Sequence, residues 1–463
     1  MDKRVTGVGC RTRLQRRRMV LIALAASFVF WMCGTAAAFE IQTGNEDVKI
    51  NWDNTIRYNL GHRIGTQDKA VIANMNLDDG DRNFKSGFVT NRLDILSEFD
   101  VSYRKSYGVR VSGAGWYDQV YKDHLDNGSV ATSNHFDDNG NQAIGFSGYA
   151  KKHYAGPDGE LLDAFAFGNF SIGDIPVQIK AGRHTLYFGE SLLLVAALNG
   201  ISYSQSPLDI AKGYAVPGVS VKELFRPLNS VSVTAQPFST LSITGQYFLQ
   251  WESHRYPEAG TYLGIYDYLL SGSEAVLDPM LGVIVRGDDI TPSQTKDWGV
   301  AMRWSPVWLD GTLGFYYRYF SDRFPQAHVN LEPLLLGSSA GINLAYPSGI
   351  DLYGISLSKQ ILGISVGAEF SYRKNMPLVC DSVYIASDFL ASILGLPAGT
   401  YVAALPDSGD TGGTRGDTFH GVLNFLGIIN KTPLFDTAQW TVEFNWQRWD
   451  KVTQGDLIRT CFL

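Results

Sequence analysis

The amino-acid sequence predicts an all-β fold, a transmembrane antiparallel β-barrel with long outer loops. The first observation is that many short segments alternate between apolar and polar residues, as strands of an outer-membrane barrel do. The second is composition, since the chain of 463 residues has 48 Gly and 13% aromatic residues. The third is that no apolar run beyond residue 38 reaches the roughly twenty residues of a membrane-spanning helix.

The N-terminus predicts a secretory signal peptide over residues 1–38. An arginine-rich segment at residues 11–18 precedes the apolar run Met19–Ala38, which ends in three alanines. This order of charged, apolar and small residues indicates cleavage before Phe39. The alternative is a membrane anchor, but the apolar run is short for a span. Residues 39–463 are then expected to form one barrel domain.

Charge and cysteine content exclude several classes of protein. Without the leader, 32 Lys and Arg stand against 45 Asp and Glu, a net charge of −13. Such a chain is a poor partner for nucleic acid. Only Cys380 and Cys461 remain, too few for a disulfide-built domain. The eight histidines are scattered, so neither a metal site nor a cofactor is expected from His/Cys clusters.

The stretch Asn91–Gln119 shows the strand pattern most clearly. Its first half alternates between a largely apolar set of residues and a set that contains Asp94, Glu98 and Asp100. Successive side chains of a strand point to opposite faces, so one face is apolar and the other acidic. A tight turn is predicted at Lys105-Ser106, which gives a hairpin of strands roughly ten residues long, the length of a tilted membrane strand.

Thirteen strands of this kind are predicted along the chain. Two belong to the hairpin above, and the other eleven are predicted at Val48–Leu60, Asp163–Phe170, Pro176–His184, Asn229–Gln236, Leu241–Trp251, Asp297–Trp304, Leu313–Phe320, Leu352–Ser358, Ile364–Arg373, His420–Ile428 and Trp440–Trp449. Short turns follow the even-numbered strands and long segments follow the odd-numbered ones. Bacterial barrels have short periplasmic turns and long outside loops, so the first strand is expected to run outward.

The strand count leads to an expectation about the C-terminus. With thirteen strands the two chain ends lie on opposite sides of the membrane, whereas bacterial barrels have an even number. We therefore expect 14 or more strands in an intact chain and a C-terminal truncation or frameshift near residue 450. The alternative is one miscounted strand.

The acidic stretch Asn76–Gly87 raises the possibility of a calcium loop. Asp79, Asp81 and Asn83 have the spacing of the first half of such a loop. The pattern then needs Gly and a later Glu, where this chain has Phe84 and Thr90. The favoured interpretation is a polar outer loop held by Asp–Arg pairs.

Two segments carry a family resemblance. The first is DDGDRNFKSG followed by NRLDILSEFDV, and the second is Ala181–Val233. The second has motif matches at Gly182, Arg183, Gly189, Glu190, Ser191, Pro207, Asp209, Pro217, Gly218, Lys222 and Glu223. Over nearly all of its mature length the chain resembles the bacterial family of domain of unknown function 1302. The resemblance implies an outer-membrane barrel that acts as a channel for small or hydrophobic compounds.

The segment Thr185–Pro227 is too long and too apolar for a simple solvated loop. We expect it to fold into the barrel as a constriction or plug, since irregular backbone is tolerated there inside protein. The alternative is a packed outside cap. The residues expected at the constriction are Arg183, Gly189, Glu190, Ser191, Asn199, Asp209, Lys222 and Glu223.

The strand pattern also predicts which charged residues line the lumen. These are Asp94, Glu98, Asp100, Arg110, Lys180, Arg303, Arg318, Glu369 and Glu443. Both signs occur, so no strong ion selectivity is expected. An apolar plug within a wall of mixed charge favours a small hydrophobic or amphipathic solute.

The predicted function is therefore a channel-like protein of the cell outer membrane. Its expected partners are outer-membrane lipid, the barrel-assembly machinery and the solute, and the oligomeric state is open. The alternative is a sealed barrel that acts as an assembly scaffold or surface-interaction protein. Catalysis by Ser191 with His184 or His420 is not expected, since the sequence FGESLL around Ser191 is not a Gly-x-Ser-x-Gly elbow.

Overall fold

The fold is described from a computed structural model of the chain. The structure describes residues 39–122, 125, 129, 132–137, 139–193, 198–217, 219, 221–264, 266–378, 383–433 and 435–455. The predicted signal peptide, Cys380 and Cys461 lie outside these residues. So does the tail after Gly455, so the expected truncation stays a prediction.

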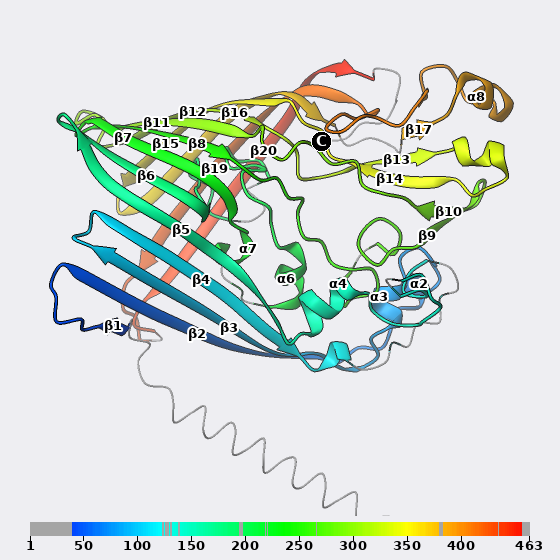
Figure 1. Cartoon of the computed structure of the whole chain (residues 1–463), viewed down its shortest axis with the longest axis horizontal. Helices are drawn as coiled ribbons and strands as arrows, with labels where there is room; N and C mark the ends of the chain where they lie inside the picture. Colours follow the sequence, from blue (N-terminus) through cyan, green and yellow to red (C-terminus); the bar gives the residue numbers. More distant parts are fainter. Residues whose placement is uncertain are drawn as a thin grey trace, which may run out of the picture.

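A single curved antiparallel sheet forms the body of the molecule (Figure 1). Its fourteen strands pair in chain order, as in a meander, and this confirms the predicted β-barrel. They are β1 (Phe39–Ile41), β2 (Val48–Arg63), β3 (Gly87–Tyr103), β4 (Tyr107–Asp118), β5 (Asp158–Ile172), β6 (Ile175–His184), β7 (Leu228–Phe238), β8 (Leu241–Phe248), β11 (Trp298–Trp304), β12 (Gly311–Phe320), β15 (Ile350–Ile361), β16 (Ile364–Pro377), β19 (Arg415–Ile429) and β20 (Ala438–Gln454). Thirteen of them match the predicted strands, and the short β1 is additional.

Side chains alternate across this sheet as predicted. On β3, Leu93 and Ile95 are 48% and 45% exposed, whereas Asp94 and Leu96 are 5% and 6% exposed. Exposed apolar residues also lie opposite each other on strands distant from β3, such as Ile355 on β15 and Phe370 on β16. A large exposed apolar surface is unfavourable in water but suits a hydrocarbon environment. The convex face of the sheet is therefore the lipid-facing surface of a transmembrane barrel.

Connections at the two ends of the barrel differ in length (Figure 1). At one end residues 104–106 turn β3 into β4, and Arg104 and Lys105 have positive φ angles. At the same end β15 and β16 are joined by Leu362 and Gly363, which also have positive φ. Long segments with helices and further strands emerge from the other end. The predicted alternation of short turns and long loops is confirmed.

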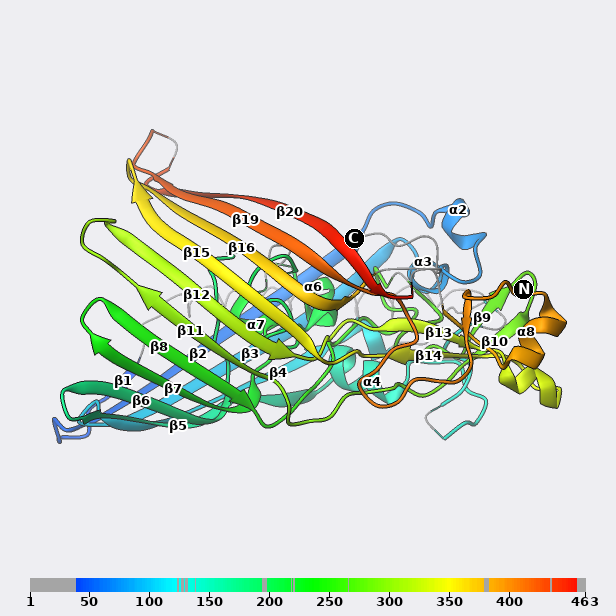
Figure 2. The same ribbon diagram turned by 90° about the horizontal axis from the view of Figure 1, so that it is seen from above.

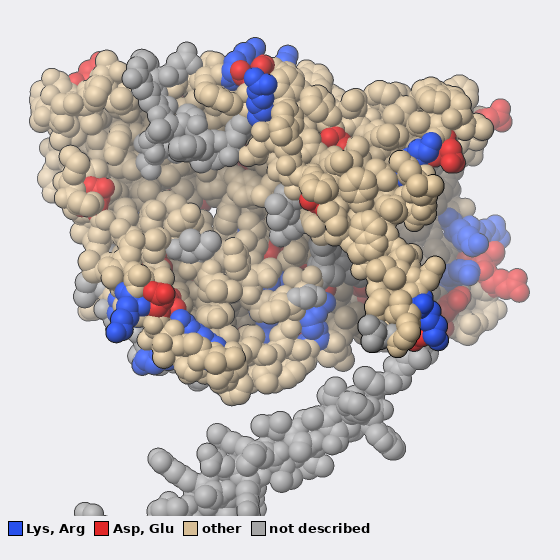
Figure 3. All heavy atoms as spheres, turned by 180° about the vertical axis from the view of Figure 1, so that it is seen from behind, with Lys and Arg blue, Asp and Glu red and all other residues tan. Residues whose placement is uncertain are grey.

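The two edges of the sheet are not joined to each other. Among the strands that the structure describes, β20 pairs with β19, and β1 pairs with β2, but β20 pairs with neither β1 nor β2. Seen from behind, the molecule is hollowed between two rims (Figure 3).

A second, six-stranded sheet forms from the outer loops, which the sequence analysis did not predict. It pairs β18, β17, β13, β14, β10 and β9 in that order and lies beyond one end of the barrel (Figure 2). Its strands are β9 (Ala275–Asp278), β10 (Gly282–Arg286), β13 (Gln326–Asn330), β14 (Gly341–Ala345), β17 (Val383–Ile385) and β18 (Tyr401–Val402). The helices η3 (Glu332–Leu336) and α8 (Asp388–Leu394) pack with it around Leu331, Ile342 and Leu390.

Short helices lie in the long connections of the first half of the barrel. They are α2 (Lys69–Ile72), α3 (Asp79–Arg82), η1 (Val120–Lys122), α4 (Gly148–Ala150), η2 (Lys151–Ala155), α6 (Ile210–Ala215) and α7 (Val221–Leu224). Phe84, Tyr121, Phe146 and Tyr154 form an aromatic core beneath them. None of the described helices is long and apolar enough to cross a membrane.

One strand boundary differs from the sequence prediction. The strand β8 ends at Phe248, not at Trp251, and Trp251 does not belong to the lipid-facing surface. Its indole is buried among the outer loops and packs edge-on against Tyr346. The apolar alternation continues past the strand end because tertiary packing, rather than lipid, surrounds these residues.

Candidate functional site

The segment between β6 and β7 lies inside the curve of the sheet. Its helices α6 and α7 are found within the barrel outline in both views (Figures 1 and 2). We call residues 185–227 the inner segment. Polar residues on the concave face of the sheet hold it at several points.

Glu369 on β16 holds the start of the inner segment. Its carboxylate accepts hydrogen bonds from the backbone N–H of Glu190, Ser191 (2.6 Å) and Ile201 (2.6 Å). The side chain is buried, with 6% exposure. Three converging backbone donors are what a buried carboxylate needs to stay satisfied, so Glu369 fixes the path of the segment.

Gly189 explains why the chain can approach Glu369 so closely. It has a φ of +96°, which L-residues rarely adopt. A Cβ atom at this position would lie 2.5 Å from Oε1 of Glu369. Both features require glycine at position 189.

Three further strands hold the same part of the segment. Glu443 on β20 accepts hydrogen bonds from the backbone N–H of Leu192 (2.8 Å) and Leu193 (3.1 Å). Arg303 on β11 lies 3.5 Å from the carboxylate of Glu190. Asn424 on β19 donates to the backbone carbonyl of Glu190 at 2.6 Å. The segment is thus held by side chains from separate strands of the concave face.

Two buried arginines hold the middle of the segment through its carbonyl groups. Arg318 on β12 donates to the carbonyl oxygens of Ile201 (2.8 Å) and Tyr203 (2.5 Å). Arg373 on β16 donates to the carbonyl of Gly200 (2.9 Å), and its guanidinium lies over the ring of Tyr203. Both guanidinium groups are nearly inaccessible to solvent, so they act as fixed donors rather than as mobile surface charges.

The residues considered for catalysis are partnered elsewhere. The hydroxyl of Ser191 lies 3.2 Å from that of Ser202. His184 bonds the hydroxyl of Ser232 (2.9 Å), and His420 lies 3.1 Å from the side-chain oxygen of Asn199. Among the described contacts neither histidine reaches Ser191.

The C-terminal part of the segment is held by ion pairs. Glu223 on α7 pairs with Arg57 of β2 (2.8 Å) and with Lys212 of α6 (3.1 Å). Asp209 caps α6 and pairs with Arg255 of the loop after β8 (2.5 Å). The side chain of Lys222, another predicted constriction residue, lies outside the described part of the chain.

A cavity of about 380 Å³ lies between the inner segment and the strands β3 to β6. We call it the lower cavity. Its charged and polar lining includes Glu98, Arg110, Asp163 and Lys180, and its apolar lining is Leu96, Leu162, Phe165, Tyr187, Phe225 and Pro227. Lys180 lies over the ring of Phe165, with its ammonium 5.5 Å from the ring centre. Charged and apolar groups therefore face the same space.

Arg110 forms ion pairs with three acidic residues beside the lower cavity. Its guanidinium contacts Glu98 (2.5 Å), Asp100 (2.9 Å) and Asp163 (3.3 Å). Three carboxylates against one guanidinium leave the cluster with a negative balance. Asp94, also predicted to line the lumen, instead pairs with Arg92 at 2.9 Å and is almost fully buried.

A second cavity of about 800 Å³ lies nearer the outer loops. We call it the upper cavity. Its lining is mostly polar and includes Lys152, Arg226, Glu252, His254 and Arg255. Arg226 and Arg183 share the carboxylate of Glu252, at 2.6 and 3.7 Å.

The inner segment separates the two cavities at residues 225–227. Phe225 and Pro227 line the lower cavity, whereas Arg226 between them lines the upper one. Phe225 and His254 also line a much smaller cavity that lies among residues of the inner segment. Phe225 is 7% exposed and packs edge-on against Tyr187. This aromatic pair lies on the lower-cavity side of the partition, next to Arg226 on the upper-cavity side.

The histidines of the upper cavity are neutral near physiological pH. Burial lowers the pKa of His153 to about 3, and the nearby Arg255 acts in the same direction. Burial also lowers the pKa of His254 well below its ordinary value, together with Arg323 and Arg226. The permanent charges of the upper cavity are therefore those of its arginines, lysine and carboxylates.

Several residues of these contacts were not identified from the sequence. Arg57, Arg373 and Asn424 lie on concave-facing positions of their strands, and the alternation of the strands could have shown this. Phe225 and Arg226 lie in irregular backbone, where no periodic pattern exists to indicate which way a side chain points.

Comparison with protein families gives one match. The family described as Protein of unknown function (DUF1302) matches residues 19–461. The chain belongs to the DUF1302 family. Among curated protein sequences, none matches the chain.

Among solved structures, this DUF1302 chain is similar to OccD3 (OpdP) of Pseudomonas aeruginosa, with 9% identity and a TM-score of 0.33. The aligned part covers 89% of this chain and 62% of OccD3, so the chain spans less than two thirds of that protein's length. It is also similar to OprB of Pseudomonas putida, with 12% identity and a TM-score of 0.28, covering 86% and 88% of the two chains.

The location of this DUF1302 protein follows from its own features. The folded chain is a β-barrel with an apolar convex face and unequal loop lengths at its two ends. Barrels of this kind are inserted in bacterial outer membranes. The protein is a β-barrel of the cell outer membrane.

Proposed function

We propose that this DUF1302 protein is an outer-membrane channel that admits a small hydrophobic or amphipathic solute. The observation that carries the proposal is the lower cavity, which the inner segment leaves open against β3 to β6. On strands β11 to β20, polar side chains of the concave face bind the inner segment instead. A solute would pass from the upper cavity, past Phe225, into the lower cavity.

The lining of the lower cavity supports an amphipathic solute. Phe165, Tyr187 and Phe225 offer aromatic surface, and Arg110 and Lys180 offer donors on the same side. A solute with a ring or short alkyl group and one polar end could satisfy both kinds of lining at once. The protein then acts as a transporter rather than an enzyme.

Planar-bilayer recordings of the refolded chain in KCl test this proposal. We expect a steady single-channel conductance that rises in Phe225→Ala, because the substitution removes the partition between the cavities. We also expect benzoate, which has a ring and a carboxylate, to reduce the current more than acetate at equal concentration. Phe238→Ala is a matched control, since Phe238 is 67% exposed at the short-turn end of β7.

A sealed barrel would give a different result. If neither the parent chain nor Phe225→Ala conducts, although both insert, the lower cavity is not part of a continuous path. Equal block by acetate and benzoate would show a pore without preference for amphipathic solutes.

One observation favours the second candidate, a surface-interaction protein. Five large apolar residues of η3 and α8 are exposed on the outer sheet: Leu335, Leu336, Phe389, Ile393 and Leu394. Light scattering of the parent and of Leu336→Asp in detergent tests this candidate. Self-association that the substitution abolishes, with conductance unchanged, would support a role for this surface in assembly.

A further inference from the structure

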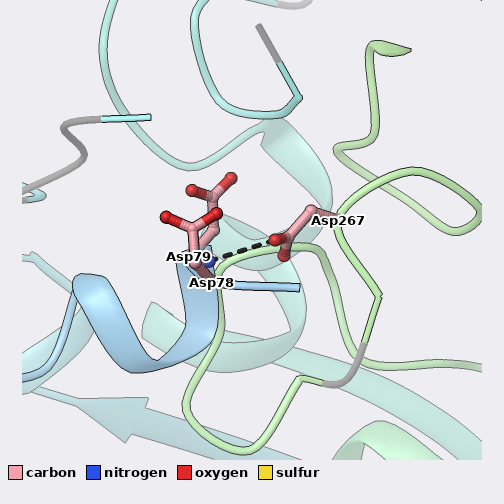
Figure 4. A group of neighbouring side chains, drawn as sticks. All are labelled: Asp78, Asp79 and Asp267. Carbon is pink, nitrogen blue, oxygen red and sulfur yellow. Dashed lines mark hydrogen bonds between the residues drawn. The ribbon is translucent and has the colours of Figure 1, made fainter. Parts of the chain in front are cut away.

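Three outer loops meet at a cluster of aspartates. Asp78 and Asp79 lie at the start of α3, after β2, and Asp267 belongs to the connection after β8. Asp267 accepts a hydrogen bond from the backbone N–H of Asp79 at 3.0 Å (Figure 4). Ser133, from the connection after β4, donates its hydroxyl hydrogen to the carboxylate of Asp79. The cluster therefore joins loops that are distant in the sequence.

The three carboxyl groups are buried close to one another. Each residue is 0% exposed, and one oxygen from each lies within 4.8 Å of the others. Arg82 forms an ion pair with Asp78, and among the described residues it is the basic side chain that pairs with the cluster. Three carboxylates beside one guanidinium leave an excess of negative charge in a desolvated site, and the nearby His135 is itself paired with Glu274. Such an excess is unfavourable unless something neutralises it.

The hydrogen bonding of the cluster is also incomplete. The Oδ1 atoms of Asp78, Asp79 and Asp267 are buried and lack a hydrogen-bond partner among the described residues. The same holds for Oδ1 of Asn134, which is 2% exposed and whose amide donates to Ser133 Oγ at 3.1 Å. Buried polar atoms in folded proteins nearly always have partners, so several unpartnered oxygens that face one another form a donor set suited to a cation.

The titration behaviour of the cluster agrees with this geometry. Burial raises the pKa of Asp79 to about 6, and the nearby Asp78 adds to the rise. Burial raises the pKa of Asp267 to about 7, with Asp79 and Asp78 acting in the same direction. Either protons or a cation can neutralise the site. Carboxylate and amide oxygens on flexible loops are the ligands that calcium prefers.

We propose that Asp78, Asp79 and Asp267 bind one calcium ion, which ties the loops after β2, β4 and β8 together. The carboxamide of Asn134 borders the site and is a candidate further ligand. This site differs from the calcium loop that the sequence spacing suggested. Asp81 pairs with Arg63, and Asn83 donates to the carbonyl of Gly260, so neither joins Asp79 in one site.

The first test is calcium binding by the purified full chain in detergent at pH 7.5. We expect isothermal titration calorimetry to show one site per chain and thermal unfolding to shift to a higher temperature in about 5 mM calcium than in EDTA. This concentration exceeds the roughly 0.1–1 mM dissociation constants of extracellular calcium modules. Magnesium, which demands stricter octahedral geometry, should give a smaller shift.

Substitutions separate a metal site from a merely structural cluster. We expect Asp267→Asn and Asp79→Asn to weaken calcium binding by at least about tenfold. In EDTA both variants should be as thermostable as the parent or more so, because each removes one of the repelling charges. Asp137→Asn is the matched control, since Asp137 is an acidic loop residue outside the cluster, and it should keep the calcium shift.

Two results would overturn the proposal. One is equal unfolding temperature in calcium and EDTA, with no heat of binding. The other is evidence that protons alone neutralise the three carboxylates. Because the pKa values are raised above the ordinary value of about 4, that stabilisation would be complete below about pH 4 and lost as the pH rises through about 6 to 7. A fall in unfolding temperature between pH 5 and pH 8 that calcium does not change would establish it.

Discussion

The two sides of the barrel interior use their charged residues differently. On the side formed by β11 to β20, Arg318, Glu369 and Arg373 are buried against the backbone of the inner segment. On the side formed by β3 to β6, Glu98 and Arg110 pair with neighbouring side chains and face the lower cavity. The same kind of residue thus holds a loop on one side and lines a space on the other.

This difference shows that charge alone does not identify a channel wall. The alternation of a strand places a side chain inside the barrel, but its role depends on whether backbone or open space lies opposite it. Substituting a buried charge that binds backbone groups lowers the stability of the fold strongly, whereas a hydrated ion pair contributes little to stability. Substitutions on the two sides should therefore have unequal effects.

Glu369→Ala should have the largest effect of the substitutions on the two walls. Removing the carboxylate leaves three backbone N–H groups of the inner segment without their acceptor. We expect the free energy of unfolding to fall by about 3 kcal/mol and the conductance to become larger and noisier, because the segment is released. Urea unfolding followed by tryptophan fluorescence and bilayer recordings measure the two effects.

The control is Glu98→Ala on the opposite side of the barrel interior. It should lower the free energy of unfolding by less than Glu369→Ala does. A loss equal to that of Glu369→Ala would remove the distinction between the two walls.

Gly189→Ala should have the next largest effect. The new Cβ would lie 2.5 Å from Oε1 of Glu369, and the φ of +96° disfavours alanine. We expect a loss of about 2 kcal/mol in unfolding free energy, measured by the same urea titration. Gly245→Ala on β8 serves as control, since its Cβ would meet nothing within 4 Å. Equal stability of both variants would mean that the segment is not held tightly at position 189.

Arg110→Ala should change stability least and ion selectivity most. Its partners are side chains facing the lower cavity, so we expect a loss of about 1 kcal/mol or less. Without the guanidinium the cavity keeps Glu98, Asp100 and Asp163, and the channel should prefer cations more strongly. Reversal potentials in a KCl gradient measure this shift. An unchanged reversal potential would place the conducting path away from β3 to β6.

The barrel wall could be predicted from the sequence because its pattern is local. Leu93 and Ile95 point outward and Asp94 points inward for a reason contained in one strand, the twofold alternation of side chains. The turn predicted at Lys105-Ser106 was equally accessible, because polar residues interrupt the apolar alternation there. The outer sheet was not predicted, since its strands are short and come from three separate loops.

The sequence by itself thus determined the long barrel strands and their two faces. Only the tertiary structure decided which groups meet. Glu369 meets Ile201 across 168 residues, and Asp79 meets Asp267 across 188. The physical reason is that alternation is a property of neighbouring residues, whereas these partners are brought together by the curvature of the sheet and the packing of its loops.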